Sequence, residues 1–201
     1  MTLQLLDYLG VFVFAMSGAL LASRKQMDVF GFTVLALLPA VGGGTLRDLI
    51  LDTPVFWTED TGYLLLTLGA AIITWFGYPY MERFTRPLAW LDALGLAVFC
   101  VAGTAKALAL TGNMIVAAMM GVVTAVAGGI LRDTVANEVP LVLRQEVYAI
   151  AAFTGAAVFL ILHTLQVPGA QWLAMLSALV LRGLGIARGW SLPQAGQQDR
   201  S

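Results

Sequence analysis

The sequence has little cysteine, histidine or charge, and each shortage excludes a class of protein. It contains one cysteine, Cys100, and one histidine, His163, among 201 residues. A single cysteine cannot form an intrachain disulfide, and without a Cys/His cluster we predict no metal site. Charged residues make up 11% of the chain and the formal net charge is -1, so there is no basic surface of the kind that binds nucleic acid. The chain also lacks a nucleophile elbow, an HExxH motif and paired catalytic acids, so we predict no enzyme and no cofactor.

Hydrophobic residues are abundant instead. They make up 59% of the chain, and the mean hydropathy is +0.84. A soluble domain of this length cannot bury so much apolar surface, whereas lipid solvates that surface directly. We therefore predict an all-α integral membrane protein whose exterior contacts membrane lipids.

Seven stretches are long and apolar enough to supply the roughly 20 residues that a membrane-spanning helix needs. They cover about 4–22, 29–52, 62–81, 90–110, 113–137, 146–164 and 169–187. The first lacks the basic segment and cleavage site of a signal peptide, so we interpret it as a helix of the mature protein. Residues 1–190 then form a single transmembrane domain, and the polar residues 191–201 form a C-terminal tail.

Basic residues are unevenly distributed between the two sets of connections. If the N-terminus is outside, the cytoplasmic loops and tail hold Arg24, Lys25, Arg83, Arg86, Arg144, Arg188 and Arg200. The outside connections hold almost none, apart from Lys106 near the outer end of the fourth stretch. The positive-inside rule therefore predicts a multi-pass protein of the cell inner membrane, with its N-terminus outside and its C-terminus in the cytoplasm.

The chain contains an internal repeat with an offset of 85 residues. At this offset the string Gly-Gly-x-Leu-Arg-Asp at 43–48 aligns with the same string at 128–133. Asp7-Tyr-Leu-Gly aligns with Asp92-Ala-Leu-Gly at the same offset. Matches of Gly, Arg and Asp carry more weight than the apolar matches that any two membrane helices share, so we interpret the pattern as a duplication.

Each copy of the repeat holds three of the spanning stretches. Repeat 1 covers about 4–82 and repeat 2 about 89–165. Because three is odd, the second copy enters the membrane from the opposite face, which predicts an inverted 3+3 repeat about an axis in the membrane plane. The seventh helix, about 169–187, has no counterpart and either closes the bundle or forms a subunit contact.

Glycines interrupt the second and fifth predicted helices near their middles, at Gly42, Gly43, Gly44, Gly128 and Gly129. Pro39 precedes the first group by one turn. Glycine is a poor helix former and proline removes a backbone donor, so these positions predict a kink or an unwound turn near the bilayer midplane. Such a break is typical of a permeation or substrate site. The alternative is that the glycines only allow two helices to pack closely.

Arginine and aspartate follow the glycines in both copies, as Arg47-Asp48 and Arg132-Asp133. Ionisable groups at membrane depth usually face a cavity or a partner, so these four are candidate pore charges or gate residues. Adjacent residues on a helix point about 100° apart, which places each Arg-Asp pair poorly for bonding within itself. We therefore predict partners on other elements, including pairs across the pseudo-two-fold axis, and we expect the two copies to meet near the membrane centre.

Five further polar residues are secondary candidates: Asp7, Asp92, Lys106, Ser17 and Thr104. The two aspartates stand at the starts of predicted helices, where they serve either as N-caps or at the two mouths of a path. The lysine either extends to the lipid headgroups or takes part in gating. The serine and threonine either line a polar path or bond carbonyls of their own helices.

These motifs resemble those of the trimeric intracellular cation (TRIC) channel family in its short prokaryotic form. The resemblance rests on Gly42-Gly43-Gly44-Thr45-Leu46-Arg47-Asp48 and on Ala127-Gly128-Gly129-Ile130-Leu131-Arg132-Asp133, and it covers about 3–187. It implies a homotrimer in which each protomer has its own pore, bounded by kinked second and fifth helices. It also implies permeation of monovalent cations, mainly K⁺ and Na⁺. Ala127 stands where the first copy has glycine, which suggests a milder second break.

Two functions fit the predicted architecture best. The first is a monovalent cation channel, in which carbonyls near the breaks and the carboxylates of Asp48 and Asp133 attract the ion while the arginines brace or gate the path. The alternative is a secondary transporter of a small amino acid such as glycine, an activity also described for bacterial members of the family that the chain resembles. The duplicated ionisable pairs argue against a third class, a non-transporting membrane scaffold.

Overall fold

The computed structural model describes residues 2–81, 83, 86–144 and 147–190, and within these ranges the regular structure is entirely helical. The described ranges contain seven longer helices: α1 (Thr2–Arg24), α2 (Val29–Ile50), α4 (Gly62–Met81), α5 (Pro87–Thr111), α6 (Met114–Val135), α7 (Ala149–Thr164) and α8 (Ala170–Arg188). Two short helices, α3 (Phe56–Glu59) and the 3-10 helix η1 (Leu141–Leu143), were not predicted. The predicted C-terminal tail, 191–201, lies outside the described residues.

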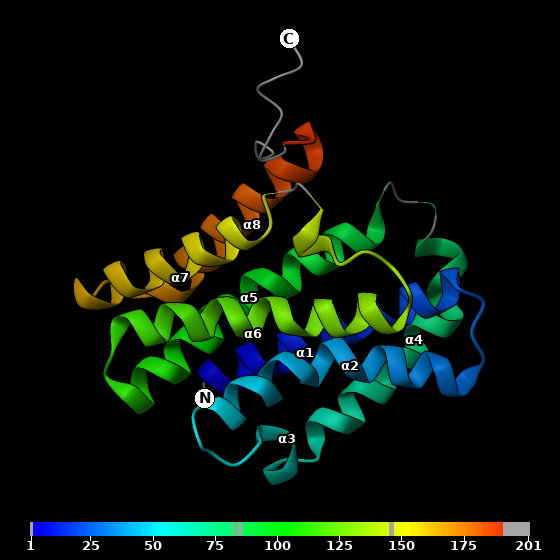
Figure 1. Cartoon of the computed structure of the whole chain (residues 1–201), viewed down its shortest axis with the longest axis horizontal. Helices are drawn as coiled ribbons and strands as arrows, with labels where there is room; N and C mark the ends of the chain where they lie inside the picture. The colour runs from blue at the N-terminus through cyan, green and yellow to red at the C-terminus, as the bar shows by residue number, and fades with distance from the viewer. Residues whose placement is uncertain (1, 82, 84–85, 145–146, 191–201) are drawn as a thin grey trace.

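Helices α5 and α6 run through the middle of the molecule, as Figure 1 shows. Helices α7 and α8 pack together on one side of them, and α4 packs against α1 and α2 on the other. Among the described residues, six helices are long and apolar enough to cross a membrane, while α7, with 16 residues, is shorter than that limit. The predicted spanning stretches therefore coincide with long helices, although their ends differ by a few residues.

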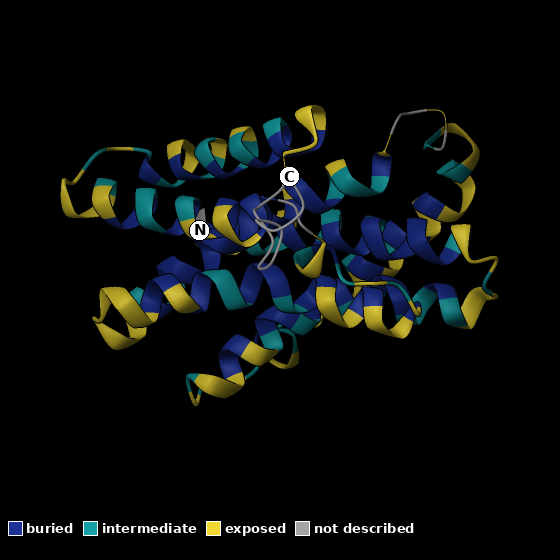
Figure 2. Cartoon of the chain, turned by 45° about the horizontal axis from the view of Figure 1, so that its top comes forward, coloured by how far each residue is buried: buried dark blue, intermediate teal, exposed yellow. Residues whose placement is uncertain are grey.

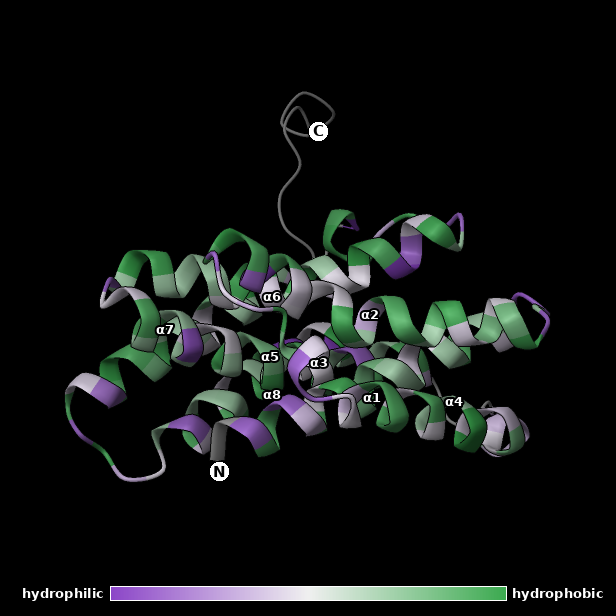
Figure 3. Ribbon diagram, turned by 90° about the horizontal axis from the view of Figure 1, so that it is seen from below, coloured by the Kyte–Doolittle hydropathy of each residue, from purple (hydrophilic) through white to green (hydrophobic). Residues whose placement is uncertain are grey.

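The outer surface of the bundle is apolar. Large hydrophobic side chains such as Phe76 of α4 and Ile115 of α6 are exposed, whereas α5 is mostly buried among its neighbours. Figure 2 shows exposed positions on the outward faces and at the helix ends, and Figure 3 shows hydrophobic helix bodies with hydrophilic positions concentrated toward the connections. This distribution is opposite to that of a soluble protein and suits a lipid environment.

Equivalent positions of the two copies begin helices α2 and α6 in the same way. The Asp28 side chain accepts a hydrogen bond from the Gly31 amide at 2.8 Å and caps α2. The Asn113 side chain, 85 residues later, accepts from the Ile115 amide at 3.0 Å and caps α6. Both residue types are favoured N-caps because the short side chain bonds an amide that the first helical turn leaves unpaired.

Helices α2 and α6 cross at their glycines without losing helical structure. Both helices are continuous through these positions, so the unwound turn predicted as one form of the break is wrong. A Cβ atom on Gly43 would lie 2.1 Å from the Thr124 carbonyl oxygen, and one on Gly128 would lie 2.5 Å from the Pro39 carbonyl oxygen. The glycines therefore allow the two backbones to touch, which was the packing alternative.

This crossing predicts a large difference between two glycine-to-alanine substitutions. We expect Gly43→Ala to lower the melting temperature by at least about 5 °C, because the new methyl group meets backbone that has no room to move. Gly69→Ala in α4 is the matched control, since a Cβ at Gly69 meets nothing within 4 Å. It should leave stability unchanged or raise it slightly, because alanine is the better helix former. Thermal unfolding of the purified protein in detergent checks this, and equal melting temperatures would contradict it.

Candidate functional site

The first charged cluster consists of Asp7 of α1, Arg47 and Asp48 of α2, and Lys106 of α5. Asp48 Oδ1 accepts from Arg47 Nε at 2.7 Å and from Lys106 Nζ at 2.8 Å. Asp48 Oδ2 accepts from the Phe56 amide at 3.0 Å, at the start of α3. Asp7 Oδ1 lies 3.9 Å from Arg47 Nη1. Asp48 thus joins three elements, and its side chain is completely buried.

Arg47 is held in this cluster by only part of its guanidinium group. The side chain is 1% exposed, and its guanidinium carbon lies 5.8 Å from the centre of the Phe56 ring. Neither terminal nitrogen, Nη1 or Nη2, has a hydrogen-bond partner among the described residues. A buried guanidinium normally has its donors satisfied, so these two nitrogens are capable of binding a further acceptor.

The second charged cluster consists of Asp92 of α5 and Arg132 and Asp133 of α6. Asp133 Oδ1 accepts from Arg132 Nε at 2.8 Å, and Asp133 Oδ2 accepts from the Leu141 amide of η1 at 3.0 Å. Arg132 Nη1 donates to Asp92 Oδ1 at 2.8 Å and also to the hydroxyl of Ser17 in α1. All three charged side chains are buried or nearly so.

The two clusters repeat each other at an offset of 85 residues. Asp48 and Asp133 each bond the arginine before them and an amide eight residues later. The aromatic packing is reciprocal as well, since Cβ atoms on Gly10 and Gly95 would meet the rings of Phe99 and Phe14 respectively. Equivalent residues therefore make equivalent contacts, as expected if the two halves fold alike.

The structure corrects the predicted pairing of the arginines. Arg47 bonds Asp48 and Arg132 bonds Asp133, although these neighbours were expected to point apart. The long arginine side chain bends back so that its Nε reaches the next carboxylate. No contact links Arg47 or Asp48 with Arg132 or Asp133 in the described part of the chain, so the predicted pairs across the pseudo-two-fold axis are wrong. Partners on other elements do exist, namely Lys106 for Asp48 and Asp92 for Arg132.

The secondary candidates also take definite roles. Asp7 and Asp92 are each the sixth residue of their helix, so they are not N-caps, and each faces the arginine of its own copy. Lys106 does not extend to the lipid headgroups, because its ammonium binds Asp48. Ser17 contacts Arg132, whereas the Thr104 hydroxyl donates to the Cys100 carbonyl of its own helix at 2.7 Å.

The clusters lie apart rather than together at the centre. Helices α2 and α6 are antiparallel, because Gly43 faces Thr124 while Pro39 faces Gly128. Each Arg-Asp pair follows its glycines toward the C-terminal end of its own helix. At 1.5 Å per residue, the two pairs are therefore separated by roughly 20 Å along the bundle. The two copies therefore contact each other at their glycines, whereas the charges, which were expected to meet as well, lie apart.

Sequence reasoning missed a buried arginine in α8. Arg182 is 0% exposed, and its guanidinium carbon lies 4.9 Å from the centre of the Tyr148 ring. Its signal was present in the sequence, since it is an isolated charge within the apolar stretch that became α8. An ionisable residue inside a spanning helix is itself evidence for a specific partner.

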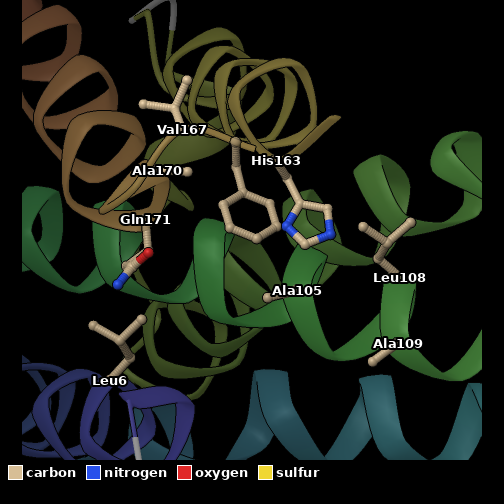
Figure 4. Close-up of a pocket in the computed structure, with 9 residues that line it drawn as sticks. Leu6, Ala105, Leu108, Ala109, His163, Val167, Ala170 and Gln171 are labelled. Carbon is tan, nitrogen blue, oxygen red and sulfur yellow. The ribbon is translucent and has the colours of Figure 1, made fainter. Parts of the chain in front are cut away.

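Two hollows lie beside these elements. One, of about 390 Å³, is lined by Leu6, Ala105, Leu108, Ala109, Phe159, His163, Val167, Ala170 and Gln171. Figure 4 shows the His163 imidazole facing this mostly apolar hollow, where the ring stacks on Phe159 at 5.5 Å. The other, of about 300 Å³, lies against Asp133 and is lined by Leu21, Arg24, Lys25, Leu88, Glu138, Leu141 and Arg144 as well.

Glu138 bridges two connections at the second hollow. Its carboxylate lies 2.6 Å from the Lys25 ammonium and 3.2 Å from the Arg144 guanidinium. The Lys25 ammonium, and to a smaller extent Arg144, hold the pKa of the Glu138 carboxyl below its usual value. The bridge therefore contributes fully above the ordinary glutamate pKa of about 4.3 and is lost as the pH falls through the lowered pKa.

We expect this bridge to give the connection between α1 and α2 a pH-dependent protection from hydrogen exchange. Protection factors of amides 24–28 should fall on acidification of the wild type. In Glu138→Gln they should already be reduced at pH 7 and should change less with pH. Glu59→Gln, which alters an exposed acid on a different element, is the control. An unchanged profile in Glu138→Gln would show that the bridge does not hold the connection.

Comparison with known proteins agrees with this arrangement. A family model described as "Glycine transporter" matches the chain twice, over residues 4–79 and 89–164. The inner membrane protein YadS of Escherichia coli K12 is 41% identical over 193 residues, which cover 94% of this chain and 93% of that protein. A membrane protein of Vibrio cholerae is 46% identical over 168 residues, which cover 81% of this chain and 67% of that protein.

Solved structures match over almost the whole length. The TRIC trimeric intracellular cation channel orthologue from Rhodobacter sphaeroides is 43% identical, with a TM-score of 0.89 over 94% of this chain and 99% of that chain. A structure described as a prokaryotic TRIC channel in 0.5 M KCl is 29% identical, with a TM-score of 0.86 over 96% of this chain and 99% of that chain. The chain therefore belongs to the trimeric intracellular cation channel family, as one of its prokaryotic members.

Proposed function

We propose that this chain is a cation channel of the inner membrane, with a path through each protomer between α1, α2, α5 and α6. One observation carries the proposal: the Lys106 ammonium lies 2.8 Å from the buried Asp48 carboxylate, while 29% of the lysine side chain is exposed. The Lys106 ammonium, which is partly exposed, thus binds the Asp48 carboxylate that a permeant cation would otherwise contact. Movement of the Lys106 ammonium away from Asp48 would free this carboxylate for a permeant cation and open the path.

The helices between the two clusters are in close contact, which describes a closed path. A Cβ on Gly121 would lie 2.0 Å from Thr104 Oγ1, and one on Gly103 would lie 2.5 Å from Thr124 Oγ1. Opening therefore requires α2 and α6 to move relative to α5. Pro39, which lacks a backbone donor within α2, and the glycines beside it supply the weakest helical segment for that movement. The permeant ions we propose are K⁺ and Na⁺.

The proposed arrangement in the membrane is an inverted 3+3 repeat with a seventh helix, α8. The basic residues Lys25 and Arg144 meet Glu138 at the end of the bundle that holds the second cluster. Placing that end in the cytoplasm puts the N-terminus outside and the first cluster near the outer surface. We also propose a homotrimer, on the basis of the trimeric relatives. Mass measurement of the detergent-solubilised protein should give three copies, and a monomer would contradict this part.

A second candidate, uptake of glycine, is favoured by the description of the family model and by one feature of the first cluster. The two terminal nitrogens of Arg47, which have no hydrogen-bond partner among the described residues, suit the carboxylate of an amino acid, since arginine binds carboxylates through two parallel hydrogen bonds. The amino group of the same ligand would then take the place of Lys106 at Asp48. Glycine, which has no side chain, is the amino acid that needs the least space.

Reconstitution separates the two functions. Purified protein in a planar bilayer should show unitary potassium currents if it is a channel. Proteoliposomes of the same preparation should then show no saturable glycine counterflow. Absent currents together with saturable counterflow would instead establish the transporter. A preparation of Asp48→Asn is the matched control in both assays, because it removes the carboxylate that either function uses.

A further inference from the structure

The first charged cluster has no formal net charge. It contains two acids, Asp7 and Asp48, and two bases, Arg47 and Lys106. Lys106 comes from the other half of the chain, so a residue of the second copy balances the acids of the first. Neutrality matters here because a buried group with a net charge is costly in a medium of low polarity.

The second cluster lacks the corresponding lysine. The position 85 residues before Lys106 is Leu21, which is buried and apolar. The remaining members, Asp92, Arg132 and Asp133, carry a formal charge of -1, and all three are at least 96% buried. Either the fold tolerates an unbalanced acid at this depth, or a cation from another element completes the cluster.

Arg182 of α8 supplies that cation. Its side chain is fully buried, and its guanidinium carbon lies 4.9 Å from the centre of the Tyr148 ring. The Tyr148 hydroxyl and Asp92 Oδ1 lie on the same side of Gly129, at 3.2 and 3.5 Å from a Cβ placed there. Arg132 Nη2 lies 3.9 Å from the same Cβ position, so Tyr148 contacts Arg182 through its ring and has its hydroxyl beside the ion pair of Asp92 and Arg132.

We propose that Arg182 is a positioning residue that completes the second cluster, as Lys106 completes the first. The seventh helix, which has no counterpart in the duplication, thereby replaces the lysine that the first copy does not provide. The two cations differ in kind. Lys106 is a flexible ammonium with 29% of its side chain exposed, whereas Arg182 is a planar guanidinium fixed on an aromatic ring and 0% exposed.

This difference makes the two ends of the path unequal, an interpretation that rests on the proposed channel function. The first cluster contains a cation that can move into water, so it is the end that opens. The second cluster contains a cation that is fully buried against the Tyr148 ring, so it braces the helices. One duplicated site thus becomes a gate and the other an anchor, because Arg182 of α8 joins the second cluster, whereas the first cluster has the partly exposed Lys106.

A double-substitution cycle tests the charge balance. Arg182→Met and Asp92→Asn each leave one net charge in the cluster, and each should lower the melting temperature by about 10 °C. The combined variant is neutral again and should recover at least half of that loss. Arg188→Met, which makes the same chemical change at an exposed position of α8, is the control and should melt within about 2 °C of the wild type. Arg182→Lys, which keeps the charge, should have a melting temperature between those of the wild type and Arg182→Met.

Either of two results overturns the proposal: Arg182→Met as stable as Arg188→Met, or a combined variant whose loss equals the sum of the single losses. If a single variant fails to fold, the combined variant decides, because recovery of the folded protein supports the balance and its absence contradicts it. Lys106→Met should lose less than half as much stability as Arg182→Met, since water compensates the partly exposed site. These thermal measurements do not depend on ion conduction. A wild type that does not conduct would therefore contradict the proposed channel function, while the double-substitution cycle would still test the role of Arg182.

Discussion

Potassium channels formed by Lys106→Met should be open about ten times more often than the wild type. The ammonium and the Asp48 carboxylate lie 2.8 Å apart, and a hydrogen bond to a charged group contributes about 1.5 to 3 kcal/mol when shielded from water. Partial exposure of Lys106 reduces this value to about 1.4 kcal/mol, which corresponds to a tenfold change in the equilibrium between closed and open forms. Methionine keeps an unbranched side chain, one atom shorter, and removes the ammonium with its charge and hydrogen-bond donors, so single-channel recording in symmetrical KCl measures the effect of the ammonium.

Two further variants make this result specific. Lys106→Arg retains a cation opposite Asp48 and should stay within about threefold of the wild type. Lys25→Met removes an ammonium that lies 2.6 Å from Glu138 at the other end of the bundle, and its open probability should not rise. An open probability in Lys106→Met equal to or below that of the wild type would show that this lysine does not hold the path closed.

The sequence was most informative about the long helices. Each predicted stretch coincides with a helix, and in the described part of the chain six of these helices have the length to cross a membrane, while α7 has 16 residues. Hydrophobic length is informative because a helix in lipid must satisfy its own backbone and needs about 20 apolar residues to span. The short helices α3 and η1 were missed for the same reason, since neither is defined by hydrophobicity. Each instead forms where its first amide bonds a buried aspartate, as Phe56 does with Asp48 and Leu141 with Asp133.

The candidate charges have partners on other elements, as predicted, but the predicted pairs across the pseudo-two-fold axis are wrong. Helical geometry describes where a Cβ atom points, and this rule fails for arginine because its Nε lies several bonds beyond the Cβ. The contact between Lys106 and Asp48 joins residues far apart in the chain, so no local pattern indicates it. Arg182 was missed because the seventh helix lies outside the repeat, so no equivalent residue in another copy marks it.

The glycines illustrate how a pattern with two interpretations is settled by packing. Low helix propensity predicted a break, but propensity is worth about 1 kcal/mol per glycine and is easily exceeded by tertiary contacts. At Gly43 and Gly128 the backbones of α2 and α6 touch, and this packing holds both helices continuous. The same residues still leave the helices easier to bend, so a helix that is continuous in the closed form is compatible with movement on opening.

Arg132→Met should be markedly more destabilising than Arg47→Met, although the two arginines are equivalent in the duplication. Arg132 contacts Asp92, Asp133 and Ser17 and is completely buried. Its removal leaves the Asp133 carboxylate with the Leu141 amide as its remaining described partner. Removal of one member of a buried ion pair costs about 3 to 5 kcal/mol, which for a protein of this size lowers the melting temperature by about 10 °C or more.

Arg47→Met leaves the Asp48 carboxylate with more partners than Arg132→Met leaves the Asp133 carboxylate. Asp48 keeps the Lys106 ammonium at 2.8 Å and the Phe56 amide at 3.0 Å, and the guanidinium that is lost had two nitrogens without hydrogen-bond partners. We therefore expect the decrease in melting temperature caused by Arg47→Met to be no more than half of that caused by Arg132→Met, when both are measured in the same detergent. The double variant Arg47→Met/Lys106→Met also removes the ammonium beside Asp48, and its melting temperature should be as low as that of Arg132→Met. Equal losses for the two single variants would mean that Lys106 does not stabilise Asp48, and that the two clusters are alike in stability despite their different cations.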